Sequence, residues 1–129
     1  MPGRFLVDTN ILVAALNDEQ MVQIHLDEAD QVWLCAPVLA ELFFGARKSG
    51  RSEPNLRRVE VLAVKYSVLN CDADTARFFG LIKNELRSQG RPIPENDVWI
   101  AAIALQHDLT LVTRDAHFGA VANLKTQSW

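Results

Sequence analysis

The chain has 129 residues, a formal net charge of −3 and 49% hydrophobic residues. This length fits one domain, residues 1–129, and charged residues interrupt the apolar runs well before a membrane-spanning length. We therefore expect a protein that does not span a membrane, and the slight acidity argues against a broad basic surface for nucleic acid. The first residues lack the pattern of a secretory signal, so we expect a cytoplasmic protein.

Short apolar runs alternate with longer segments of helical periodicity along the chain. In chain order, the pattern predicts a strand at 5–7, helices at 10–16 and 19–29, a strand at 31–36, helices at 37–47 and 56–66, a strand at 68–71, a helix that begins near 72–74 and ends before 90, a helix at 97–106 and a strand at 109–113. We therefore expect an α/β fold of three layers, α/β/α, whose short parallel sheet has about four to five strands.

Four acidic residues occupy unusual places in this pattern. Asp8 and Asp115 follow predicted strands by one or two residues, and ligands of parallel sheets collect at the carboxyl ends of strands. Glu41 lies inside a helix with apolar neighbours on almost every side, and Asp97 opens the helix at 97–106. Each acid alone has an ordinary interpretation: Asp8 and Asp97 as helix caps, Asp115 as a turn residue, and Glu41 as the partner of an arginine.

Taken together, the four carboxylates predict a cation site. Carboxylates that converge at one end of a sheet repel each other unless a cation neutralises them, and hard oxygen ligands suit Mg²⁺ or Mn²⁺ rather than zinc. The three histidines, His25, His107 and His117, are scattered and show no ligand spacing. The sequence has neither a glycine-rich phosphate loop nor a serine nucleophile elbow, so metal-assisted hydrolysis is the chemistry that remains.

Four segments in chain order carry a resemblance to a known family: FLVDTNILVAAL, LAELFFGA, GRPIPENDVWIAAIAL and LTLVTRDAHF. Together they resemble the PIN-domain ribonucleases, most closely the VapC-like toxins of type II toxin–antitoxin modules. The resemblance covers nearly the whole chain, and it implies a PIN domain over 1–129.

The resemblance also assigns the site residues. It implies an acidic quartet that holds one or two Mg²⁺ or Mn²⁺ ions and two polar residues that orient ligands or water. The quartet consists of Asp8, Glu41, Asp97 and Asp115, and the polar residues are Asn10 and Thr113. Glu95, two residues before Asp97, is a further candidate ligand.

The implied activity is that of a toxin endoribonuclease. The ion would lower the pKa of water, and hydrolysis of RNA would leave a 5′-phosphate and a 3′-hydroxyl with no side chain acting as nucleophile. We expect Arg47, Lys48, Arg51 and Arg114 to add positive charge for the RNA phosphates.

The same resemblance implies protein partners. Such toxins are held inactive by a cognate antitoxin, a segment of which lies in an apolar groove, and we also expect a homodimer. Phe43, Phe44 and Trp99 are candidates for the groove or the dimer face, although each also fits the core.

Three other functions fit parts of the sequence. The first is a PIN-like RNA-binding or scaffold module without cleavage activity. The second is a nuclease of related fold that acts on structured DNA, although the chain has no room for the insertions that grip a duplex. The third is an α/β domain without nuclease activity, whose acids are only helix caps.

Overall fold

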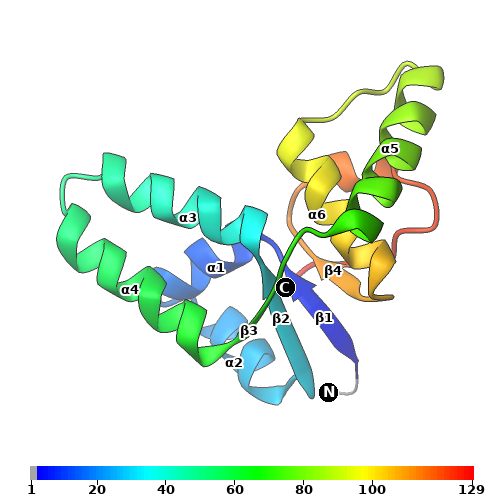
Figure 1. The fold of residues 1–129 in the computed structure, drawn as a ribbon. Coiled ribbons are helices and arrows are strands. Elements are labelled where there is room, and N and C mark those ends of the chain that lie inside the picture. The colour runs from blue at the N-terminus through cyan, green and yellow to red at the C-terminus, as the bar shows by residue number, and fades with distance from the viewer. Residues whose placement is uncertain (1–2) are drawn as a thin grey trace.

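A computed structural model describes residues 3–129, and five parallel strands form a sheet between two groups of helices (Figure 1). The strands are β1 (Arg4–Val7), β2 (Gln31–Cys35), β3 (Ser67–Leu69), β4 (Thr110–Val112) and β5 (Thr126–Gln127). The helices are α1 (Thr9–Leu16), α2 (Gln20–Glu28), α3 (Ala36–Lys48), α4 (Ser52–Lys65), α5 (Ala73–Ser88), α6 (Glu95–Gln106) and the short 3₁₀ helix η1 (Ala116–Ala120). The α/β class with a short parallel sheet is therefore confirmed.

The strand order, β3-β2-β1-β4-β5, explains the two helical layers. The chain moves from β1 to β2 to β3 in one direction along the sheet, and then crosses back to β4 on the other side of β1. Because crossover connections are right-handed, this reversal puts α1 to α4 on one face and α5 and α6 on the other. Figure 1 shows the two groups apart, with β1 and β2 between them. The order reverses between β1 and β4, which is where parallel sheets bind ligands.

Most helix boundaries lie within one residue of the sequence-based expectation, but α4 and α6 begin earlier. Helix α4 begins at Ser52 rather than 56, because Pro54 lies in its first turn, where a missing N–H costs nothing. Helix α6 begins at Glu95, so Asp97 lies inside its first turn. Two elements, η1 and β5, were not expected, because segments of two to five residues are too short to show a periodic pattern.

Helix α6 is the most deeply buried helix, and it fixes the position of the acid in its first turn. Its buried residues are Val98, Ile100, Ala101, Ala102, Ile103 and Ala104. Small alanines let this helix pack closely between its neighbours, with α5 on one side and β4 and α3 also in contact. Within residues 3–129, no helix combines the length and the hydrophobicity needed to cross a membrane.

We predict that the core valine of α3 carries far more stability than an exposed valine of α4. Val38 is fully buried, whereas Val64 is 86% exposed. Val38→Ala should lower the free energy of unfolding by about 2–3 kcal/mol, through lost burial and the cavity left behind. Val64→Ala, the same change in another helix, should stay within about 0.5 kcal/mol of the parent chain. Urea unfolding followed by circular dichroism measures both, and equal effects would contradict the described packing.

Candidate active site

Asp8 and Thr113 leave the sheet side by side from the paired strands β1 and β4. Val7 and Val112 are partners in the β1–β4 ladder, and the N–H of Asp8 donates to the carbonyl of Val112 at 2.9 Å. The Thr113 hydroxyl donates to Oδ2 of Asp8 at 2.7 Å, and Asp8 is only 4% exposed. Thr113 therefore holds a buried carboxylate in a fixed orientation.

Asn10 completes this network from the first turn of α1. Its side-chain amide donates to Oδ2 of Asp8 at 3.2 Å, and its carbonyl oxygen accepts the backbone N–H of Arg114 at 3.1 Å. The hydroxyl of Thr113 accepts the backbone N–H of Asp115 at 3.0 Å, which fixes the turn after β4. The two polar residues expected to orient the site, Asn10 and Thr113, do contact its acids.

Glu41 approaches the same edge of the sheet from α3. The side-chain amide of Asn96, in the first turn of α6, donates to the Glu41 carboxylate. The contact joins the two helical layers across the end of the sheet. Glu41 lies in the second turn of α3, on its exposed side.

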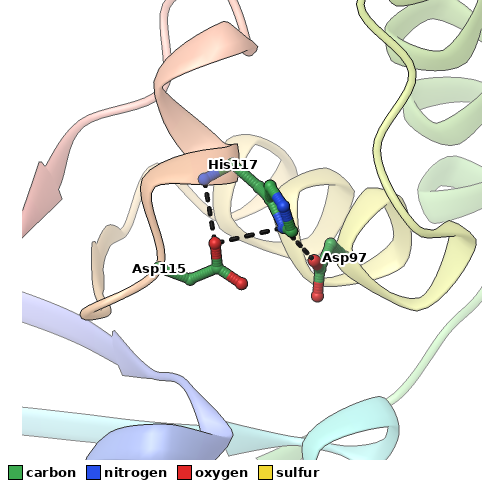
Figure 2. Close-up of side chains that lie close together, drawn as sticks. All are labelled: Asp97, Asp115 and His117. Atoms are coloured by element: carbon green, nitrogen blue, oxygen red, sulfur yellow. Dashed lines mark hydrogen bonds and ion pairs between the residues drawn. The ribbon is translucent and has the colours of Figure 1, made fainter.

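Asp97 and Asp115 face each other across the imidazole of His117 (Figure 2). Nδ1 of His117 lies 3.1 Å from Oδ1 of Asp115 and 3.5 Å from Oδ2 of Asp97. The backbone N–H of His117 also donates to Oδ1 of Asp115 at 2.9 Å. The sequence analysis found no ligand spacing among the three histidines, and the structure places one of them, His117, beside two of the four acids. The signal that could have found it is local: an Asp-x-His tripeptide on the turn after a strand.

The electrostatics of these acids reflect their proximity. Burial is the main cause that raises the pKa of Asp97 to about 6, and the negative charges of Asp8 and Asp115 add to it. Burial is the main cause that raises the pKa of Glu41, and the charge of Asp8 raises it further. The hydrogen bond from Asn96 acts in the opposite direction but does not cancel these effects. Burial also raises the pKa of Asp8, although Thr113, Thr9 and Asn10 all donate to it. The four acids are thus electrostatically coupled.

Two neighbouring charged residues have partners outside the four acids. Glu95, a further candidate ligand, is exposed and forms an ion pair with Lys83 of α5, which lowers the pKa of Glu95. Arg114 forms two hydrogen bonds with Glu19, at 3.0 and 3.2 Å, and donates from Nε to the carbonyl of Trp129. It is a structural residue rather than a free cation for RNA phosphates.

The interpretation of the acids as helix caps fits only some of the four. Asp8 does cap α1, accepting the N–H of Thr9 at 2.8 Å, and Asp115 caps η1. Asp97 makes no side-chain cap hydrogen bond, and Glu41 lies within a helix. Capping therefore explains at most two of the acids.

The donor set suits a divalent cation. Asp97, Asp115 and His117 each offer one ligand atom, and these three atoms lie within 4.8 Å of one another. Among residues 3–129, no lysine or arginine forms an ion pair with the four acids. An arrangement that raises carboxylate pKa values and pairs the acids with neither lysine nor arginine is typical of a metal site.

We predict that Asp97→Asn stabilises the metal-free protein. A carboxyl whose pKa is higher in the folded state than unfolded makes stability fall as pH rises through the window from 3.8 to about 6. At pH 7 the variant should gain about 1–2 kcal/mol, less than the roughly 3 kcal/mol of the full shift because the side chain is partly solvated. Thermal unfolding in EDTA should show a Tm about 4–8 °C higher at pH 7 and little change near pH 4.

The matched control for this prediction is Asp27→Asn on the exposed side of α2. It removes the same charge from the chain but from outside the site, so its Tm should stay close to that of the parent. An Asp97→Asn variant that is destabilised in EDTA at pH 7 would contradict the described repulsion.

We predict that Thr113→Val destabilises the protein, whereas Thr113→Ser does not. Valine has nearly the same shape but cannot donate to Asp8 or accept from the N–H of Asp115, so two buried polar groups lose a partner. The free energy of unfolding should fall by about 1–3 kcal/mol for valine and by less than about 1 kcal/mol for serine. Chemical denaturation compares the two, and equal losses would show that the hydroxyl is not the important group.

Comparisons with known proteins agree on one family. Residues 5–124 match the PIN domain model. The chain is 33% identical over 129 residues to the tRNA(fMet)-specific endonuclease VapC of Shigella flexneri, and 32% identical over 129 residues to Ribonuclease VapC2 of Haemophilus influenzae, with 98% of each chain covered in both cases.

A solved structure supports the same assignment. VapBC2 from Rickettsia felis, bound to a DNA fragment from its promoter, has a TM-score of 0.88 at 27% identity and covers 100% of this chain and 99% of that one. The chain therefore belongs to the PIN domain family, among its VapC-like members.

Proposed function

We propose that this protein is a toxin endoribonuclease of a toxin–antitoxin system, which hydrolyses RNA phosphodiester bonds with Mg²⁺ or Mn²⁺ held by Asp8, Glu41, Asp97 and Asp115. One observation carries the proposal: Asp97 and Asp115 lie close together at the point of strand-order reversal, the charges of Asp8 and Glu41 help to raise the pKa of Asp97, and no lysine or arginine of residues 3–129 pairs with these acids. The ribonuclease and endonuclease names of the relatives favour RNA as the substrate.

Each residue has a distinct task in this proposal. Asp97 and Asp115 hold the cation from α6 and from the turn after β4, with Asp8 at the buried end and Glu41 at the exposed rim. Thr113 and Asn10 keep the Asp8 carboxylate from rotating. The bound ion would supply Lewis acidity, which activates water and neutralises charge on the phosphate.

Positive charge for the remainder of the RNA comes from outside the acid cluster. Arg47, Lys48 and Arg51 are exposed near the turn between α3 and α4, and none forms an ion pair in the described chain. These residues can contact phosphates beyond the one that is cut. We place the activity in the cytoplasm, where such RNA is found.

We infer that a cognate antitoxin covers a groove beside the site. This groove, of about 260 Å³, lies between α1, α3 and α4. Thr9 and Glu41 are among its lining residues, so it adjoins the acid cluster through Glu41. Its apolar lining includes Val13, Leu42 and Val59. An apolar segment seated there could direct a basic side chain at the carboxylates, and a VapBC complex is among the similar structures. A homodimer remains a prediction, for which the exposed Phe44 is a candidate contact.

The proposed function predicts metal-dependent cleavage that one substitution abolishes. Purified protein without antitoxin should cut a defined mixed-sequence RNA in Mg²⁺ or Mn²⁺ and be inactive in EDTA. Asp97→Asn should lower the rate by at least about 100-fold, because it removes a ligand of the ion, while Asp27→Asn should cut normally. Gel analysis with enzymatic end-labelling should identify 5′-phosphate and 3′-hydroxyl ends.

Two results would overturn this function. Cleavage that persists equally in EDTA and in Asp97→Asn would mean that the acids are not the catalytic group. RNA binding without cleavage, by a wild-type protein that still binds Mn²⁺, would favour the RNA-binding or scaffold module instead.

A further inference from the structure

Among the described residues, His117 is the one histidine, lysine or arginine whose side chain lies within 4 Å of a carboxylate oxygen of the four acids. It reaches Asp97 and Asp115, which come from different elements of the fold, and its own side chain is 55% exposed. In Figure 2 the imidazole stands between the two carboxylates. The ring is therefore open to solvent and to ions on one side, and faces two carboxylates on the other.

The local chain holds this imidazole in place. His117 lies in the first turn of η1, which Asp115 caps through the backbone N–H of His117 itself. The next residue, Phe118, is 1% exposed and anchors the turn in the core. Since adjacent side chains of a helical turn point in different directions, burying Phe118 leaves His117 directed toward the acids.

The separations between the ligand atoms suit one shared cation. An ion with ligand atoms at about 2.1 Å in octahedral geometry keeps neighbouring ligands about 3 Å apart and opposite ones about 4.2 Å apart. Nδ1 of His117 lies 3.1 Å from Oδ1 of Asp115 and 3.5 Å from Oδ2 of Asp97, and each of the three residues offers a ligand atom that lies within 4.8 Å of the other two. These separations are close to those that one octahedral ion needs, so rotation of the side chains can bring the three ligand atoms onto one ion.

We propose that Nδ1 of His117 is a metal ligand together with Asp97 and Asp115, so that the site prefers Mn²⁺ over Mg²⁺. This inference rests on the proposed function, which requires a divalent ion at these acids but does not distinguish between the two. Mg²⁺ is typically bound by oxygen atoms alone and retains several waters. A site with one imidazole and two carboxylates favours transition metals such as Mn²⁺, which accept nitrogen as well as oxygen ligands.

The alternative role of His117 is that of a simple positive partner for the carboxylates. A positive partner would oppose the binding of any divalent ion, and its removal would increase affinity for Mg²⁺ and Mn²⁺ alike. If His117 is a ligand, its removal would instead decrease affinity. The decrease would affect Mn²⁺ and not Mg²⁺, because only Mn²⁺ loses a bond to nitrogen. The two roles therefore differ in sign and in metal selectivity.

The test compares metal binding by three proteins without RNA. Wild type, His117→Gln and the control His107→Gln are titrated with Mn²⁺ and with Mg²⁺ by calorimetry. His107 lies at the carboxyl end of α6, at the opposite end of the helix from Asp97. We expect His117→Gln to lose at least about 10-fold in affinity for Mn²⁺ and to change by less than about 3-fold for Mg²⁺. His107→Gln should bind both ions like the wild type.

A spectroscopic measurement on the unaltered protein supplies a second readout. Pulsed electron paramagnetic resonance of bound Mn²⁺ should show nitrogen hyperfine modulation, which changes when the histidines are labelled with ¹⁵N and is absent in His117→Gln. Because the wild-type protein provides this signal, the result does not depend on how well the variant folds.

The outcomes separate this inference from the function on which it rests. If wild type binds Mn²⁺ and Asp97→Asn does not, but no nitrogen signal is seen and His117→Gln binds Mn²⁺ normally or more tightly, the histidine ligand is wrong and the metal site stands. If neither ion binds to wild type, the proposed function fails as well. The proposal is supported if His117→Gln loses both Mn²⁺ affinity and the nitrogen signal while His107→Gln retains Mn²⁺ affinity.

Discussion

The register of β1 on β4 is the constraint on which the site depends. Because Val7 is the partner of Val112, the residues that follow them leave the sheet together, and the Asp8 carboxylate meets the Thr113 hydroxyl. A shift of either strand by one residue would turn its side chains to the other face of the sheet and separate the Asp8 carboxylate from the Thr113 hydroxyl. The pairing of two short buried strands thus sets the geometry of the chemistry, and Asp115 follows because its N–H is bound to the same hydroxyl.

Most of this arrangement could be predicted from residues that obey strong local rules. Asp8 and Asp115 follow short apolar runs typical of buried strands, so their placement at the carboxyl edge follows from the parallel sheet. Glu41 and Asp97 could be placed on helices, but helix periodicity does not say which helices meet, and their approach through Asn96 depends on the packing of α3 on α6.

What could not be predicted depends on contacts between distant segments. His117 shows no ligand spacing with His25 or His107, because its partners are carboxylates and one of them lies 20 residues away on α6. Glu95 and Asp97 differ by two positions in one helical turn, which directs them to opposite sides, one toward Lys83 and the other toward the site. From the sequence alone, both residues are candidate metal ligands.

The fold also reduces the cost of holding four acids together. Three of them stand at the N-terminal ends of helical segments: Asp8 before α1, Asp97 in the first turn of α6 and Asp115 before η1. Free backbone N–H groups and the helix dipole favour negative charge at these positions. Glu41, the fourth, lies in a helix interior and relies on the Asn96 amide. Backbone N–H groups therefore offset part of the negative charge that no lysine or arginine side chain neutralises in the described chain.

Arg114 connects three parts of the chain that are remote in sequence. Its backbone N–H donates to Asn10, its guanidinium pairs with Glu19 before α2, and its Nε donates to the carbonyl of Trp129, whose ring packs on Phe5 of β1. The loop beside the acids is thereby tied to the last residue of the described chain. We therefore expect the amides of this loop and those of the C-terminal segment to exchange as one cooperative opening unit, so that the site shares its rigidity with the edge of the sheet.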